Sequence, residues 1–220
     1  MKKNIKIAAS ILSADFSNLG KEVADVVKAG ADLIHIDVMD GSFVPNITIG
    51  SSVVSSIRKY TKKPFDVHLM VENPANHIDD FVKAGSDFIT IHYEADKHPI
   101  RTLEYIKNKG IKSGISINPG SSENCLDYLL DYCDLILIML VNPGYGGQKT
   151  IESQIEKVRR VKEKIIKSNK NILLEVDGGI NKNNISKLID AGADLFVAGN
   201  SIFKNGQKYY KKNITLLKKI

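Results

Sequence analysis

Acidic and imidazole side chains recur at alternating positions in three short apolar stretches of the chain. The stretch LIHIDVM carries His35 and Asp37, the stretch FDVHLM carries His68, and the stretch LLEVD ends in Asp177. Two imidazoles and two carboxylates form an N₂O₂ ligand set that suits Zn²⁺, Fe²⁺, Mn²⁺ or Co²⁺. The pattern therefore predicts one divalent metal site, provided that the fold brings the three stretches together.

The alternation also indicates where these side chains point. Successive side chains of a strand face opposite sides, so His35 and Asp37 share one face while Ile34, Ile36 and Val38 share the other. We expect the aliphatic face to meet helices and the polar face to point inward. A single histidine of this kind is more often a structural core residue. Four buried ionisable groups together favour a metal site, because a bound cation offsets the cost of burying them.

Strands and helices alternate along the whole chain, and their order predicts the fold. Three similar segments, KAGADLIHIDV, KAGSDFITIHY and DAGADLFVAGN, recur at about two and four times a unit of about 27 residues, which is a common strand–loop–helix–loop length. Eight such units fit the chain and predict a single (β/α)8 TIM barrel domain over residues 1–220. An open doubly wound sheet is the alternative, but the first strand is not followed by its Gly-x-Gly-x-x-Gly turn. The predicted strands are Ile5–Leu12, Leu33–Asp40, Phe65–Met70, Phe88–Tyr93, Lys112–Asn118, Leu135–Val141, Ile172–Asp177 and Leu195–Gly199, with helical stretches that include Asn18–Ala29, Asn76–Ala84, Ile100–Lys109 and Ile151–Ser168.

Three methionines and three glycine-rich loops surround the predicted metal site. Met39, Met70 and Met139 fall on inward faces near strand ends, either as adaptable core filling or as an apolar floor of the site. In a barrel of this type, phosphate commonly binds between the loops after the seventh and eighth strands, which here hold the pairs Gly178-Gly179 and Gly199-Asn200. The loop NPGYGGQ after the sixth strand is typical of a lid over a bound substrate.

Composition excludes several functional classes. The formal net charge of +6 arises from 31 basic and 25 acidic side chains. The lysines are scattered and no nucleic-acid motif accompanies them, so we expect no nucleic-acid partner. No run of 18 apolar residues suggests a membrane span. The two cysteines, Cys125 and Cys133, are too few for an extracellular disulfide framework and predict reduced thiols in a cytoplasmic protein.

The motifs SILSADF, HIDVMDGSFVPNITIG, DVHLMVENP, VNPGYGGQ and VDGGI closely resemble those of the ribulose-phosphate 3-epimerase family, from the first strand to the last. The resemblance implies an isomerase of the pentose phosphate pathway that uses one divalent metal to interconvert ribulose 5-phosphate and xylulose 5-phosphate. It implies His35, Asp37, His68 and Asp177 as metal ligands, with Asp37 and Asp177 as the acid/base pair. It also implies a homo-oligomer, and substrate contacts from Ser10, His68, Gly144, Tyr145, Gly146, Gly147, Gly178, Gly179, Gly199 and Asn200.

The chain departs from the family pattern at a few positions. Gly199-Asn200-Ser201 stands where Gly-Ser-Ala is usual, which a grip made by backbone N–H groups tolerates. Leu140 replaces a usual Ser or Thr and should face away from the barrel interior, and Tyr145 replaces a usual Phe in the lid.

Epimerisation next to a ketone requires removal of a carbon-bound proton and its return on the other face, through an enediolate. Two opposed carboxylates, Asp37 and Asp177, suit that task. An allulose-6-phosphate 3-epimerase is the nearest alternative, although the pair Gly146-Gly147 matches the pentose enzyme. A barrel lyase would need a lysine at the barrel mouth, where the carboxyl ends of the predicted strands carry none, and a non-catalytic sugar-phosphate binder would not need the metal set.

Overall fold

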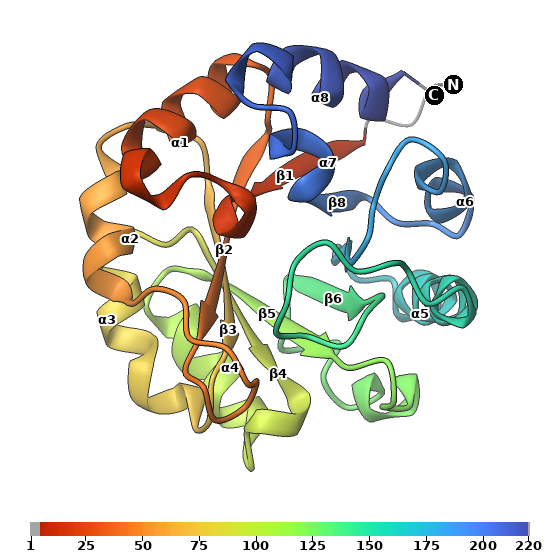
Figure 1. Cartoon of the computed structure of the whole chain (residues 1–220). Coiled ribbons are helices and arrows are strands. Elements are labelled where there is room, and N and C mark those ends of the chain that lie inside the picture. The colour runs from red at the N-terminus through yellow and green to blue at the C-terminus, as the bar shows by residue number, and fades with distance from the viewer. Residues whose placement is uncertain (1–4, 220) are drawn as a thin grey trace.

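A closed ring of eight parallel strands forms the centre of the molecule (Figure 1). In this computed structural model, which describes residues 5–219, each strand pairs with its neighbours in sequence, and β1 also pairs with β8. The predicted (β/α)8 barrel is therefore confirmed. The strands are β1 Lys6–Ser10, β2 Leu33–Met39, β3 Phe65–Met70, β4 Phe88–His92, β5 Lys112–Ile117, β6 Leu135–Met139, β7 Leu173–Asp177 and β8 Leu195–Ala198.

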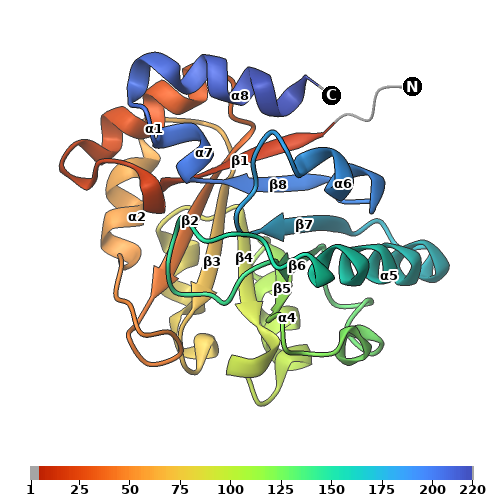
Figure 2. The same cartoon turned by 45° about the vertical axis from the view of Figure 1, so that its right-hand side comes forward.

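Helices lie outside this ring and connect most of the strands (Figure 2). The link from β5 to β6 differs from the prediction, because it contains only a 3-10 turn, η5 (Glu123–Leu126), where a full α-helix was expected. The α-helices are α1 Leu19–Lys28, α2 Ser51–Arg58, α3 Ile78–Lys83, α4 Pro99–Asn108, α5 Ser153–Ser168, α6 Ile185–Asp190, α7 Asn200–Phe203 and α8 Tyr210–Lys218, and the other 3-10 turns are η1 Ile11–Ser13, η2 Phe16–Asn18, η3 Pro74–His77, η4 Tyr93–Ala95 and η6 Gln207–Tyr209.

The apolar core has two larger parts, separated by the wall of strands, and a third, small cluster of Met39, Val44 and Met70 at the barrel mouth. Outward side chains such as Ile34, Ile36 and Val38 join the large cluster between strands and helices. Inward side chains such as Leu33, Leu135 and Leu195 form a smaller cluster inside the barrel. Leu140 is fully buried in the outer cluster, as its position in the alternation predicted. This division confirms the predicted faces of the strands and leaves the inward polar residues near the strand ends.

Most strands end one or two residues earlier than predicted, because the chain turns to build the loops of the barrel mouth. Asp40 illustrates the cause. It lies beyond β2 in an isolated bridge to Ile47, and its carboxylate accepts hydrogen bonds from the backbone N–H groups of Ser42, Phe43 and Glu72. These hydrogen bonds hold the chain in a turn directly after Met39 and so end the strand there.

Two further sequence expectations concern the whole chain. Cys125 is partly buried and Cys133 is buried, and both are free thiols. Within residues 5–219, none of the helices combines the length and the apolar character that crossing a bilayer would require.

Candidate active site

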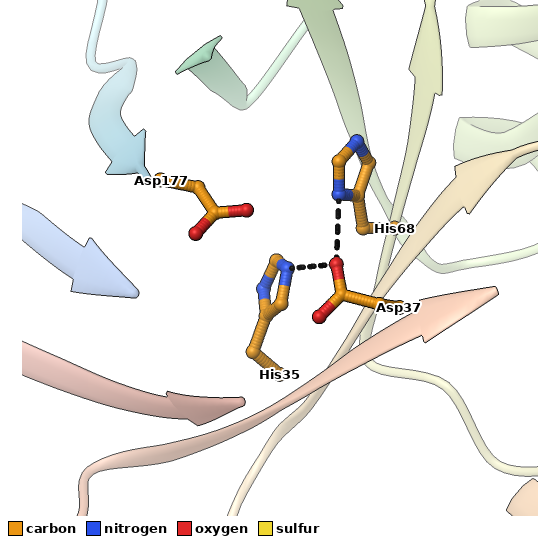
Figure 3. A group of neighbouring side chains, drawn as sticks. All are labelled: His35, Asp37, His68 and Asp177. Atoms are coloured by element: carbon orange, nitrogen blue, oxygen red, sulfur yellow. Dashed lines mark hydrogen bonds and ion pairs between the residues drawn. The ribbon is translucent and has the colours of Figure 1, made fainter. Parts of the chain in front are cut away.

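Four ionisable side chains converge at the carboxyl ends of three strands (Figure 3). His35 and Asp37 come from β2, His68 from β3 and Asp177 from β7, and one potential ligand atom of each lies within 4.8 Å of the others. The Oδ1 atom of Asp37 is 3.3 Å from Nε2 of His35 and 3.3 Å from Nδ1 of His68. The structure thus brings together the four residues predicted to bind a metal.

Strand register explains the convergence. The Cα atoms of Asp37 and His68 are partners across the β2–β3 pair, and inward residues of the two strands therefore lie side by side. Asp177 is the last residue of β7 and pairs with Met139 on β6. Since the barrel closes, the inward face of β7 looks across the interior toward β2. The carboxyl ends of the strands are also where enzymes of this fold build their active sites.

The donor set fits a divalent cation. His35 and His68 are fully buried and Asp37 is 5% exposed, so water screens these groups weakly. Nε2 of His35 is buried and has no hydrogen-bond partner among residues 5–219, although it faces the Asp37 carboxylate. A buried ring nitrogen without a partner, next to two carboxyl groups and a second imidazole, is the arrangement that Zn²⁺, Fe²⁺, Mn²⁺ or Co²⁺ would satisfy.

The two carboxyl groups are electrostatically different. Burial raises the pKa of both. At Asp37 the neighbouring imidazoles of His35 and His68 outweigh burial and hold the pKa of the carboxyl well below its usual range. At Asp177, burial and the negative charge of Asp37 act together and raise the pKa to about 7. The Asp37 carboxyl group is therefore held ionised, while the Asp177 carboxyl group takes up a proton readily near neutral pH.

The imidazoles are also shifted, in opposite directions. Burial lowers the pKa of His35, but the adjacent carboxylates of Asp37 and Asp66 outweigh burial and raise it well above its usual value. Burial lowers the pKa of His68 to about 4 despite its contact with Asp37. His68 is therefore neutral near pH 7, which is the state in which an imidazole can bind a metal.

Above the four side chains lies a pocket of ≈ 330 Å³ whose walls combine apolar strand ends with glycine-rich loops. The residues that line it include Met39, Met70 and Met139, the three methionines that the sequence placed on inward strand faces. The Ser10 hydroxyl donates a hydrogen bond of 2.7 Å to Oδ2 of Asp37, so this side chain holds the carboxylate as well as lining the pocket. The predicted site residues that line the pocket are Ser10, Asp37, Met39, Met70, Met139, Gly144, Tyr145, Gly146, Gly147, Asp177, Gly178, Gly179, Gly199 and Asn200, whereas His35 and His68 lie outside its lining.

Three glycine-bearing loops close one side of this pocket. The loop after β6 lies against the loop after β2, because the Asn46 amide donates a hydrogen bond of 3.1 Å to the Gly144 carbonyl. The Tyr145 side chain is 57% exposed at its rim, where an aromatic lid residue would lie. Lys204, at the end of α7, also lines the pocket, although the sequence reasoning did not select it. The sequence feature that could have identified Lys204 is its spacing: it follows Asn200 by four residues and so lies one helical turn from the predicted phosphate loop.

Sequence reasoning also missed the polar residues beneath the site. Oδ2 of Asp66 lies 2.6 Å from Nδ1 of His35, and Glu175 is fully buried beside them. Asp66 stands two residues before His68 and Glu175 two residues before Asp177, so strand alternation places each on the inward face and carried the signal. His92 is fully buried and contacts His68. His77 and His98 are exposed at the starts of α3 and α4, away from the site.

Comparison with known proteins gives one consistent family. A model of the ribulose-phosphate 3 epimerase family matches residues 6–203. The chain is 50% identical over 212 residues to a ribulose-phosphate 3-epimerase of Bacillus subtilis, covering 96% of this chain and 97% of that protein. It is 49% identical over 213 residues to a ribulose-phosphate 3-epimerase of Escherichia coli, covering 96% and 94% of the two chains.

Solved structures extend the likeness of the fold to more distant proteins. A mutant tryptophan synthase α-subunit from Pyrococcus furiosus superposes over 100% of both chains with a TM-score of 0.73 at 15% identity. A thiamine phosphate pyrophosphorylase from the same organism gives a TM-score of 0.65 at 15% identity, over 98% of this chain and 96% of that chain. At such low identity these matches support the barrel fold alone.

Proposed function

Because this chain belongs to the ribulose-phosphate 3-epimerase family, we propose that it interconverts D-ribulose 5-phosphate and D-xylulose 5-phosphate by inverting C3, as a step of the pentose phosphate pathway. The observation that carries this proposal is the convergence of Asp37 and Asp177 from β2 and β7, with one carboxyl group ionised and the other protonated readily. An epimerase needs such a pair, because a proton must leave one face of C3 and another must arrive on the opposite face.

The two carboxyl groups would divide the proton transfers between them. In one direction the Asp37 carboxylate accepts the C3 proton, and the Asp177 carboxyl group donates a proton to the other face of the enediolate. In the reverse direction the roles exchange. The Ser10 hydroxyl holds Asp37 from the side opposite the imidazoles, since Ser10 binds Oδ2 while the imidazoles face Oδ1. A single base would return the proton to the face from which it came.

We propose His35, Asp37, His68 and Asp177 as the ligands of one divalent metal ion, Zn²⁺, Fe²⁺, Mn²⁺ or Co²⁺. When bound, the ion would supply Lewis acidity toward the negative charge that develops on the substrate oxygens. The methionines Met39, Met70 and Met139 would keep the floor of the pocket poor in water beneath the reacting carbons.

The phosphate group would bind on the side of the pocket formed by the glycine loops. Backbone N–H groups at Gly178, Gly179, Gly199 and Asn200 serve this purpose without regard to side-chain identity, so Asn200 and Ser201 need not prevent it. Lys204 adds a positive charge to the same pocket. Gly144, Tyr145, Gly146 and Gly147 would form the lid. A cytoplasmic location and a homo-oligomeric state stay predictions from the cysteines and from the family.

A coupled assay tests the function directly. Ribulose 5-phosphate is the substrate, and xylulose 5-phosphate formation is measured together with metal content. Asp37→Asn and Asp177→Asn should each lose about 10³-fold or more in turnover, with unchanged circular dichroism. Asp190→Asn, at the exposed end of α6, is the matched control and should retain activity.

Near-normal turnover in either folded site variant would refute its acid/base role. The hexulose alternative is decided in the same assay: faster turnover of allulose 6-phosphate than of ribulose 5-phosphate would assign the chain to that substrate instead. Release of a cleaved carbon fragment would indicate a lyase, and binding without turnover of any of these sugar phosphates would indicate a non-catalytic binder.

A further inference from the structure

A third imidazole lies next to the site. His92, the last residue of β4, is fully buried, and its Nε2 atom is 2.8 Å from Nε2 of His68. The two rings are stacked, with centroids 4.9 Å apart and an interplanar angle of 26°. The ring centroid of Phe43 lies 4.8 Å from that of His92, so an aromatic side chain also packs against this imidazole. None of the proton transfers proposed above uses His92.

The contacts that run from His68 to His92 continue to the carboxylate of Glu94, just beyond the end of β4. Nδ1 of His92 is 3.3 Å from Oε2 of Glu94, which lies on η4 with its side chain 22% exposed. The other oxygen, Oε1, accepts hydrogen bonds from the backbone N–H of Asn118, at 2.8 Å, and from the Ser121 hydroxyl. Burial raises the pKa of Glu94, but these hydrogen bonds outweigh burial and lower the pKa to about 2. Glu94 is therefore an ionised group that can only accept hydrogen bonds.

With one proton on each ring, hydrogen-bond chemistry allows two arrangements of protons along the chain of contacts from Asp37 through His68 and His92 to Glu94. The two facing Nε2 atoms share one proton, because two lone pairs or two N–H groups at 2.8 Å would repel. In the first arrangement His92 donates from Nδ1 to Glu94, His68 donates from Nε2 to His92, and Nδ1 of His68 is a lone pair. In the second, every donor is reversed and Nδ1 of His68 carries a proton directed at Asp37.

Only the first arrangement leaves His68 able to bind a metal through the nitrogen that faces the other three ligands. Asp37 favours the second, because its Oδ1 atom lies 3.3 Å from Nδ1 of His68 (Figure 3). Glu94 favours the first arrangement, because in the second the lone pair on Nδ1 of His92 would face the negatively charged carboxylate of Glu94 and repel it. The negative charge of Glu94 therefore opposes the pull of Asp37 from the other end of the chain.

We propose that Glu94 and His92 are positioning residues that keep the proton of His68 on Nε2 and so present its Nδ1 lone pair to the metal site. The inference rests on the proposed metal site and adds to it a role for two residues that touch neither metal nor substrate. Asp66 would act on His35 directly: its carboxylate lies 2.6 Å from Nδ1 of that ring, so it would keep the proton on Nδ1 and leave the lone pair on Nε2. Carboxylate partners of this kind orient metal-binding histidines in general.

The variant Glu94→Gln separates this role from packing, because the amide has the same shape without the charge. Its single oxygen must still accept from the Asn118 N–H, so its NH₂ group faces His92 and favours the reversed chain. We expect the affinity of the full-length protein for Zn²⁺, measured against a competing chelator, to fall about 10- to 100-fold. Ser121→Ala removes one hydrogen bond to Glu94 but leaves the charge, and its affinity should stay within about threefold of wild type.

Nitrogen-15 NMR of the histidine rings reads the proton positions themselves. In the metal-free wild-type protein, where no cation fixes the proton positions, His92 should carry its proton on Nδ1 and His68 on Nε2. A His92 proton on Nε2, or a Glu94→Gln variant that binds Zn²⁺ within twofold of wild type, would overturn the proposal. The wild-type spectrum decides the matter even if the variant fails to fold. If the wild-type protein fails to bind one Zn²⁺ per chain, both the proposed metal site and this inference are wrong. If the wild-type protein binds Zn²⁺ and Glu94→Gln binds it equally well, only this inference is wrong.

Discussion

Replacing Gly179 by alanine should damage both stability and phosphate binding. Gly179 follows Asp177 by two residues, and its backbone has φ +67°, in the left-handed region that residues with a Cβ rarely adopt. A Cβ atom placed there would lie 2.6 Å from the Gln148 carbonyl oxygen and 2.6 Å from the Thr150 backbone nitrogen. These atoms belong to the loop that follows β6, so the added methyl group would push that loop away from the site.

The size of the effect follows from two separable costs. The left-handed backbone costs an alanine about 1 kcal/mol. Overpacking against backbone atoms, which cannot rotate away, adds about 1–3 kcal/mol. For a chain of this size each kcal/mol lowers Tm by about 2–4 °C, so Gly179→Ala should lower Tm by roughly 5–15 °C.

Gly110→Ala is the matched control for this experiment. Gly110 has φ +78°, but a Cβ there would meet no atom within 4 Å, so it bears the backbone cost alone. Its Tm should fall by about 2–4 °C, and its KM for ribulose 5-phosphate should not change. Thermal unfolding by circular dichroism and steady-state kinetics measure both. Equal Tm losses in the two variants, or an unchanged KM in Gly179→Ala, would refute the close-approach argument.

Three further predictions follow from the metal site and from two groups outside it. Zn²⁺ at 100 times its Kd should stabilise the protein by about 2.7 kcal/mol, and a chelator should reverse the Tm increase; a Tm unchanged by saturating Zn²⁺ would contradict the proposed ligands. Burial raises the pKa of Cys125 to about 11, so its thiolate at pH 8 should be about 100-fold scarcer than that of an ordinary thiol. A thiol reagent should therefore modify the folded chain far more slowly than the chain in guanidinium, and equal rates would exclude this burial effect. Because the pKa of folded Glu94 is lowered to about 2, its stabilising effect is present above about pH 4.5 and is lost as pH falls toward 2. The free energy of unfolding should thus exceed that of Glu94→Gln by about 1–2 kcal/mol at pH 7, after allowance for partial exposure, with a smaller difference in urea titrations at pH 3; a constant difference would show that the charge is not responsible.

The fold was predictable because it depends on local pattern. Alternation in β2, for example, assigns Ile34, Ile36 and Val38 to the helices and His35 and Asp37 to the interior, and the structure has both faces as predicted. The link between β5 and β6 was not predicted correctly. The alternation of strands and helices predicts a helix there, but Glu123–Leu126 forms only the 3-10 turn η5.

The amino-acid sequence by itself determined which side chains point inward and which strand ends carry imidazole or carboxylate, because strand alternation is a property of the local backbone. Only the tertiary structure decided what those side chains touch. The hydrogen bond from Ser10 to Asp37, the contact of His92 with His68 and the place of Lys204 in the pocket join residues from separate strands and loops. Such contacts depend on the register and closure of the barrel, which no local pattern records, and they set the charge and proton positions on which the proposed chemistry depends.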